Sequence, residues 1–136
     1  MKWLSGFLAA VAVAAVACSD SFKPTIENVA GTYHLQSLTT TDVTDTTDWV
    51  RAGATVSLTV DPNGTTTGSL FFPAPAVGDS DVTLDLTGTW QLSRDIVEFD
   101  QTADTFLRDM TFTATDNRLM GDQTFGGTRV RATLSK

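Results

Sequence analysis

The chain has 136 residues, of which 41% are hydrophobic, and its 16 acidic and nine basic residues give a formal net charge of −7. A surface of this charge repels the phosphates of nucleic acids, so we expect no nucleic-acid partner. Because the chain has one histidine, a zinc site built from several histidines is excluded.

The first 17 residues predict a signal peptide. Lys2 provides a positive start, and residues 7–17 form an unbroken apolar run of eleven residues. This run is too short for a helix that crosses a membrane, which needs about 20 residues. Small residues stand at Ala15 and Ala17, immediately before the single cysteine, Cys18.

The run from Ala15 to Cys18 resembles the lipobox of bacterial lipoproteins, in which the cysteine is acylated and becomes the new N-terminus. The resemblance implies that Cys18 carries acyl chains such as palmitate and anchors the protein in the cell envelope, because two or more chains give stable anchoring. Ser19 after the cysteine resembles the outer-membrane sorting preference, which leaves the periplasmic face or the cell surface open. The alternative is an ordinary secretory signal, whose cysteine stays a free thiol or is removed.

Cleavage before Cys18 leaves 119 residues with eight basic and 16 acidic side chains, a net charge of −8. This length suits one domain. Residues 18–28 are polar, contain Pro24 and show neither helical nor strand periodicity. We interpret them as an acylated cysteine followed by a flexible tether with a mean span of about 17 Å, and we place the domain at residues 29–136.

From residue 29 onward, apolar residues recur at every second position, which predicts strands with one buried face. The clearest segment is 81–92, in which Leu84, Leu86 and Trp90 share one face. Turn signals such as Asp-Pro-Asn-Gly at 61–64 separate the segments. The predicted strands cover residues 31–38, 53–60, 65–72, 81–92, 95–100, 106–115, 118–125 and 128–135.

Eight sequential antiparallel strands with one apolar face must form two stacked sheets or close on themselves. Only closure removes both exposed edges, and the mostly short turns favour a meander over a Greek key. We therefore predict an all-β, eight-stranded antiparallel up-and-down barrel. The interior of such a barrel is filled by side chains or holds one small ligand.

Three features resemble the lipocalin-like proteins of bacteria: Gly31-Thr32-Tyr33 at the start of the first predicted strand, the meander of hairpins, and the basic last strand. Lipocalins open with Gly-X-Trp, whose tryptophan closes one end of the barrel beneath an arginine from the last strand. The resemblance implies that Tyr33 takes the tryptophan position, with Arg129 or Arg131 as its partner.

If the barrel holds a ligand, its inward side chains should line the site and select an apolar compound. Arg108 has the same parity as Met110 and Phe112, so it either meets a ligand carboxylate inside the barrel or lies in water at the mouth. The alternative is that the inward side chains fill the barrel. A void above about 300 Å³ that opens near 39–52 or 73–80 would favour a ligand. The inward positions are Tyr33, Leu35, Val56, Leu58, Leu70, Phe72, Leu84, Leu86, Trp90, Val97, Phe99, Met110, Phe112 and Leu134.

The polar residues give weaker indications of a metal site or a catalytic site than the apolar residues give of a ligand site. Asp42, Asp45 and Asp48 recur in a threonine-rich segment and could gather oxygen ligands for Ca²⁺, but the segment lacks the glycine and the acid spacing of an EF-hand. We interpret it as a solvated loop. Alternation places His34 opposite to the buried face, and no Gly-X-Ser-X-Gly motif is present. We therefore expect no metal, no cofactor and no enzymatic activity.

Two classes of function remain open. The first is a lipid-anchored barrel that binds a small hydrophobic or amphipathic ligand in the cell envelope. The second is a filled barrel that contacts another envelope protein as a structural or interaction module. In both cases we expect a monomer.

Overall fold

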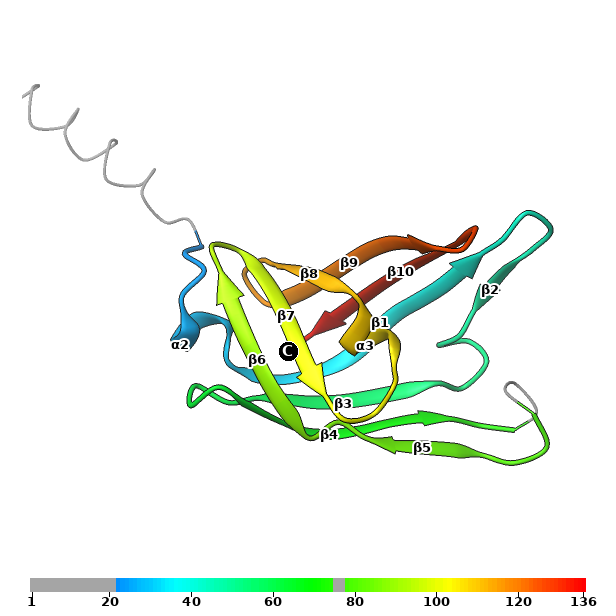
Figure 1. Ribbon diagram of the computed structural model, residues 1–136, viewed down its shortest axis with the longest axis horizontal. Helices are drawn as coiled ribbons and strands as arrows, with labels where there is room; N and C mark the ends of the chain where they lie inside the picture. The colour runs from blue at the N-terminus through cyan, green and yellow to red at the C-terminus, as the bar shows by residue number, and fades with distance from the viewer. Residues whose placement is uncertain (1–21, 75–77) are drawn as a thin grey trace, which may run out of the picture.

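The computed structural model describes residues 22–74 and 78–136, so the signal peptide and Cys18 lie outside the described residues. Figure 1 shows strands throughout, with two helices of one turn each in this part of the chain. None of the helices in these ranges has the length and apolar character that a membrane span requires. The elements are α2 (Ile26–Val29), β1 (Gly31–Thr41), β2 (Thr46–Asp48), β3 (Thr55–Val60), β4 (Thr65–Phe72), β5 (Val82–Asp85), β6 (Gly88–Ser93), β7 (Ile96–Gln101), α3 (Phe106–Asp109), β8 (Thr111–Ala114), β9 (Arg118–Phe125) and β10 (Thr128–Ser135).

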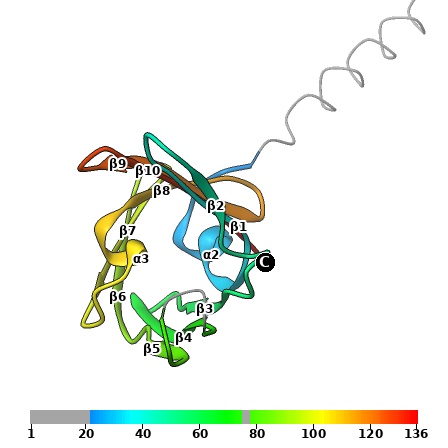
Figure 2. The ribbon, with the colours of Figure 1, turned by 90° about the vertical axis from the view of Figure 1, so that its right-hand side faces the viewer.

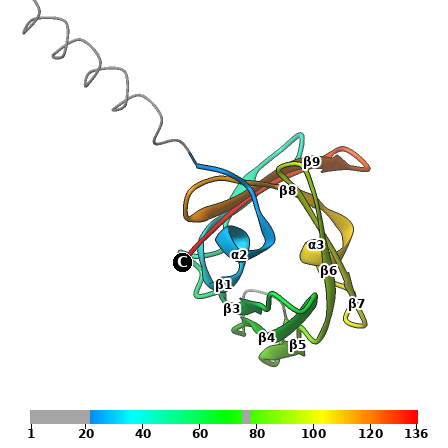
Figure 3. The ribbon, with the colours of Figure 1, turned by 90° about the vertical axis from the view of Figure 1, so that its left-hand side faces the viewer.

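The sheet closes into an eight-stranded antiparallel barrel, as the alternation predicted. Around the ring run β1, β3, β4, the pair β5 and β6, then β7, β8, β9 and β10. Strand β10 returns to pair with β1, from His34 opposite Ser135 to Thr41 opposite Arg129. Figures 2 and 3 view the ring along its axis from its two ends. The return pairing provides partners for the first and last strands, which an open sheet would leave exposed.

The predicted strand 81–92 is two strands. The second half of β4 pairs with β5, whereas Thr65 and Thr66 pair with β6. The side chain of Asp85 interrupts the predicted strand between β5 and β6. One of its carboxylate oxygens accepts hydrogen bonds from the backbone N–H of Thr87, at 2.8 Å, and from the hydroxyl of Thr87. Such a local bond competes with the strand ladder. The alternation survives the break, so the two strands together occupy one position in the barrel.

The predicted strand 106–115 begins with helix α3, and only its second part is strand β8. Thr105 caps the helix, because its hydroxyl accepts a hydrogen bond from the backbone N–H of Leu107. Leu107 is fully buried, and α3 packs against β7 on the inner side of the ring, as Figure 2 shows. The helix therefore fills space that a longer strand would have left inside the barrel.

The segment 39–52, predicted as a connection, contains the end of β1 and the whole of β2, which pair as a hairpin. A bulge lies between Leu35 and Ser37, where the register with β10 shifts. Because a bulge inserts one extra residue, the inward face of β1 changes from odd to even positions. This change turns Leu38 and Thr40 toward the interior.

Side chains fill the middle of the barrel. Phe99 and Phe112 meet edge to face, with ring centroids 5.7 Å apart, and both are buried. The inward parity predicted from the sequence is correct for most positions, but these side chains form a packed core rather than a continuous cavity. The buried core includes Tyr33, Val56, Leu58, Leu70, Leu86, Trp90, Val97, Phe99, Met110, Phe112 and Leu134.

Helix α2 closes one end of the barrel, which we call the closed end. Figure 3 shows α2 inside the ring at this end. The hydroxyl of Thr25 accepts from the backbone N–H of Asn28, and Val29 is buried. The amide of Asn28 also donates to the carbonyl of Lys23 at 2.9 Å. Residues 23–28, which we expected to belong to the flexible tether 18–28, thus make defined contacts.

Candidate ligand site at the barrel mouth

At the closed end, Lys136 covers the ring of Tyr33 and bonds to the backbone beside α2. The ammonium of Lys136 lies 5.5 Å from the centre of the Tyr33 ring and donates to the carbonyls of Asn28 at 2.6 Å and Ala30 at 2.9 Å. Partial burial lowers the pKa of Lys136. The Tyr33 hydroxyl donates to the carbonyl of Val29 at 2.5 Å. These bonds tie Tyr33, α2 and the end of β10 together at the closed end.

The expectation that Arg129 or Arg131 partners Tyr33 is wrong. Both arginines are exposed, and both point toward Asp122 on the outer face of the barrel. The reason is the strand period: odd residues of β10 face outward, whereas Val130, Ala132 and Leu134 are buried. Lys136 follows the end of the strand, where it can reach the closed end, and it takes the position that the resemblance gave to an arginine.

A cavity of about 280 Å³ lies at the opposite end, which we call the mouth. Its walls are largely apolar, and Trp49 meets Phe72 edge to face, with ring centroids 5.5 Å apart. Figure 2 views the barrel from this end. The residues that line the mouth cavity are Leu38, Thr40, Trp49, Leu70, Phe72, Leu84, Asp104, Thr105, Phe106 and Val130.

Trp49 is held over the mouth by three hydrogen bonds. Its backbone N–H donates to the carbonyl of Leu38 and its carbonyl accepts from Ala54, each at 2.9 Å, while its indole N–H donates to the hydroxyl of Thr40 at 3.0 Å. The bulge in β1 is what brings Leu38 and Thr40 to this side. Because Trp49 uses the Thr40 hydroxyl, the wall beside them presents mainly apolar surface.

The remaining wall is the segment that leads into α3. Strand β5 pairs only with β4 among the described strands, and β9 pairs with β8 only through Leu119 and Met120. At the mouth end a gap therefore lies between β5 and β9. Asp104, Thr105 and Phe106 bridge this gap and line the cavity.

Arg108 does not point into the barrel. It lies on α3, where its guanidinium bonds to the carboxylates of Asp104 at 2.7 Å and Asp109 at 3.4 Å. We placed Arg108 among the inward positions because we predicted a strand at 106–115. Residues 106–109 form helix α3 instead, so side chains there do not alternate between the two faces. Of the two expectations for Arg108, the structure supports a side chain at the solvated surface near the mouth.

The predicted lining residues separate into two groups. Leu70, Phe72 and Leu84 line the mouth cavity. The other predicted positions lie in the core or, like Leu35, are half-buried at its edge. Sequence reasoning missed Trp49, although a tryptophan inside a polar segment was a signal. It also missed the other lining positions, Leu38, Thr40, Asp104, Thr105, Phe106 and Val130.

The three aspartates considered for Ca²⁺ serve the loop itself. One carboxylate oxygen of Asp42 accepts bonds from the N–H and hydroxyl of Thr44 and from the N–H of Asp45, and these bonds lower the pKa of Asp42. Asp48 accepts from the N–H of Arg51. Within residues 22–74 and 78–136, no three metal-binding side chains gather into one cluster. Local turn geometry accounts for these aspartates.

The mouth cavity can bury one small apolar group. A volume of about 280 Å³ corresponds to about nine water molecules at roughly 30 Å³ each. It is slightly below the value of about 300 Å³ that we set for a ligand void, so the volume alone does not decide between a ligand and a filled barrel. Comparison of the chain with protein-family models, with curated proteins and with solved structures finds no match.

Proposed function

We propose that this protein is a non-enzymatic binding module, anchored in the bacterial cell envelope through Cys18, whose barrel mouth holds the apolar part of a small hydrophobic or amphipathic ligand. The observation that carries the proposal is the mouth cavity. It has an aromatic wall, it opens beside the segment 39–52, and it lies opposite to the closed end.

The chemistry of the cavity favours an amphipathic molecule over a purely polar one. Each methylene group buried against Leu84, Phe72 and Trp49 contributes about 0.8 kcal/mol. The indole N–H is already bonded to Thr40, so the inner wall offers few free polar partners. At the rim, Asp104 and Arg108 form an exposed ion pair that would lie beside a polar ligand end.

A second candidate function is contact with another envelope protein. The solid core supports it, because the barrel below the mouth is full. Two apolar side chains also stand exposed at hairpin ends: Val43 is 97% exposed between β1 and β2, and Phe125 is 37% exposed at the end of β9. The two hairpins are neighbours, since Thr41 pairs with Arg129, so this candidate places the contact at their tips. Filling the mouth should abolish ligand binding if the first candidate is right, and should leave the protein contact unchanged if the second is right.

The test is a pair of matched variants, Leu84→Trp and Leu92→Trp. Both leucines are half-buried, but only Leu84 lines the cavity. We expect the neutral fluorescent probe N-phenyl-1-naphthylamine to bind the wild-type protein and to quench Trp49. In Leu84→Trp the indole fills the cavity, so binding should weaken at least tenfold, whereas Leu92→Trp should bind as the wild type does.

Circular dichroism and thermal unfolding of both variants show that the barrel is intact. Equal affinity of the two variants, or no binding by the wild-type protein, would refute the ligand site. In that case a pull-down from envelope extracts with Val43→Asp as the control tests the second candidate.

A further inference from the structure

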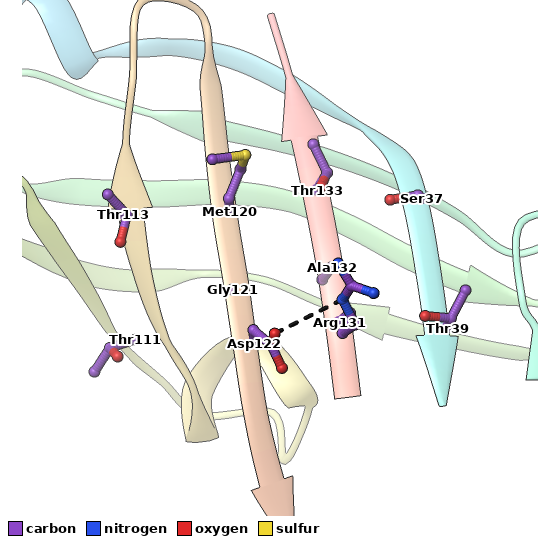
Figure 4. A pocket seen from close by; sticks show the side chains of 10 residues that line it. All are labelled: Ser37, Thr39, Thr111, Thr113, Met120, Gly121, Asp122, Arg131, Ala132 and Thr133. Carbon is purple, nitrogen blue, oxygen red and sulfur yellow. Dashed lines mark ion pairs between the residues drawn. The ribbon is translucent and has the colours of Figure 1, made fainter. Parts of the chain in front are cut away.

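The outer face of β8, β9, β10 and β1 carries a groove that is separate from the mouth. Its volume is about 670 Å³. Figure 4 shows that the residues lining it come from all four strands. Most of its side chains occupy the outward positions of their strands. The groove is lined by Ser37, Thr39, Thr111, Thr113, Met120, Gly121, Asp122, Arg131, Ala132 and Thr133.

The groove arises from small residues and from strands that diverge. Gly121 and Ala132 face each other across β9 and β10, and both direct their side-chain positions inward, so the floor between them is backbone. Strand β8 pairs with β9 only at its last residues. In Figure 4, Thr111 accordingly stands away from β9, whereas Thr113 lies close to Met120. The space between the strands deepens the groove.

The guanidinium of Arg131 lies at one side of this groove. Arg129 holds the carboxylate of Asp122 with two bonds, from Nε at 2.9 Å and from Nη2 at 2.6 Å. Arg131 approaches the same carboxylate only to 3.7 Å, and its side chain is 63% exposed. Among residues 22–74 and 78–136 this is its one charged contact, so most of its five N–H donors remain available to a ligand. The two arginines and Asp122 carry a net charge of +1, in a chain of net charge −7.

The rest of the groove wall is hydroxylated. Ser37 stands opposite Thr133, and Thr39 stands opposite Arg131, on adjacent strands. Hydroxyl groups both donate and accept hydrogen bonds. Met120, which is 41% exposed, adds a flexible apolar surface beside them. This combination of one cation, several hydroxyls and one apolar side chain complements a molecule that has an anionic group and several hydroxyls of its own.

We propose that this groove binds a sugar that carries an anionic group. The guanidinium of Arg131 binds the anion in a two-pronged geometry, which suits carboxylate and phosphate alike. The threonine hydroxyls bond to the sugar hydroxyls, and Met120 packs against the apolar face of the ring. The groove has the volume of about twenty water molecules, which accommodates a monosaccharide.

Nuclear magnetic resonance titration of the isotope-labelled protein with glucuronate tests the proposal. We expect the amide signals of Thr39, Met120 and Arg131 to shift. The variant Arg131→Gln should weaken binding about tenfold or more, because a charged hydrogen bond is lost. Arg51→Gln is the matched control, since Arg51 is an exposed arginine outside the groove, and it should leave the affinity unchanged.

A third variant changes the affinity in the opposite direction. Asp122→Asn removes the carboxylate that Arg129 and Arg131 share, so glucuronate should bind more tightly than to the wild-type protein. Weaker or unchanged binding by Asp122→Asn would contradict the proposed role of the arginines. Unperturbed amide spectra away from the groove confirm that each variant remains folded.

Additional ligands test the anionic group and the sugar ring separately. Glucose 6-phosphate should bind at the same place, and its affinity relative to glucuronate distinguishes a phosphate from a carboxylate ligand. Glucose should bind more weakly than either, because it lacks the charge. Equal binding of acetate and glucuronate would show a simple anion site and overturn the sugar proposal, as would an Arg131→Gln variant that binds glucuronate with the wild-type affinity.

Discussion

At the scale of single residues, Tyr33 connects the first strand to the closed end. Its side chain is fully buried, its hydroxyl donates to the carbonyl of Val29, and Lys136 lies over its ring. Burial raises the pKa of Tyr33 to about 12 from the ordinary value of 10.0. The neutral hydroxyl is thus the form that the folded protein favours.

This shift predicts a loss of stability in alkaline solution. Because the folded pKa lies above the unfolded one, the contribution of Tyr33 is fully present below pH 10 and is lost as the pH rises toward about 12. Urea unfolding followed by fluorescence should show this decline. Tyr33→Phe should flatten it and cost about 1 kcal/mol at neutral pH, through the lost hydrogen bond.

Direct titration of the Tyr33 hydroxyl provides a control for this prediction. Tyr33 is the only tyrosine, so the absorbance of tyrosinate reports its titration directly. A titration midpoint near 10 in the folded protein would contradict the buried hydroxyl.

At the scale of elements, β4 changes its partner along its length, from β6 to β5. Gly68 lies at this change, and its carbonyl accepts from the backbone N–H of Leu86 at 3.0 Å. Its φ is +134°, and a Cβ atom there would lie 1.9 Å from the carbonyl oxygen of Ser57 on β3. Only glycine fits this position, because both the conformation and the space exclude a side chain.

A pair of glycine variants separates these two causes. Gly64 also has a positive φ, of +95°, but a Cβ atom there has no neighbour within 4 Å. We expect Gly64→Ala to destabilise the protein by about 1–2 kcal/mol through backbone strain alone. Gly68→Ala should cost about 3 kcal/mol or more, because β3 and β4 must also separate.

Chemical denaturation of the two variants under identical conditions provides the measurement. If the two substitutions cost the same, the close approach of β3 to Gly68 is not as the structure describes it.

At the scale of the whole molecule, the barrel has two unlike ends. The described chain enters through α2 at the closed end (Figure 1). Trp49 and Phe72 line the cavity at the mouth. The first described residue, Phe22, is four residues from Cys18, a distance of at most about 14 Å along an extended chain. An anchor at Cys18 would hold the closed end toward the membrane, with the mouth turned away from it.

The anchor has its own prediction. Expressed in a Gram-negative host, the wild-type protein should sediment with the membranes and take up an azide-labelled palmitate. Cys18→Ser should remain in the soluble fraction without label, because the acceptor thiol is lost. A sulfhydryl that reacts freely in the purified wild-type protein would instead support the ordinary secretory signal.

Much of the barrel could be predicted from local signals. The bounds of β4, β9 and β10 are those predicted, since glycine, asparagine or proline flanks β4 and β9 on both sides and Gly127 precedes β10. The bulge in β1 had a signal too, because Leu35 and Leu38 are three apart where alternation requires two. The Asp85–Thr87 bond and the cap at Thr105 were harder to recognise, because alternation of apolar residues continues through both.

The sequence alone determined that this protein consists of antiparallel strands with one buried face, because an apolar residue at every second position is a local property that survives small errors in strand bounds. It favoured a closed barrel over two stacked sheets, and the pairing of β10 with β1 confirms the closure. Only the tertiary structure decided that the barrel is filled, that Lys136 rather than an arginine covers Tyr33, and that the cavity lies at the mouth. These features depend on how side chains from strands that are distant in sequence pack together inside the ring. The sequence of a single segment does not contain that information.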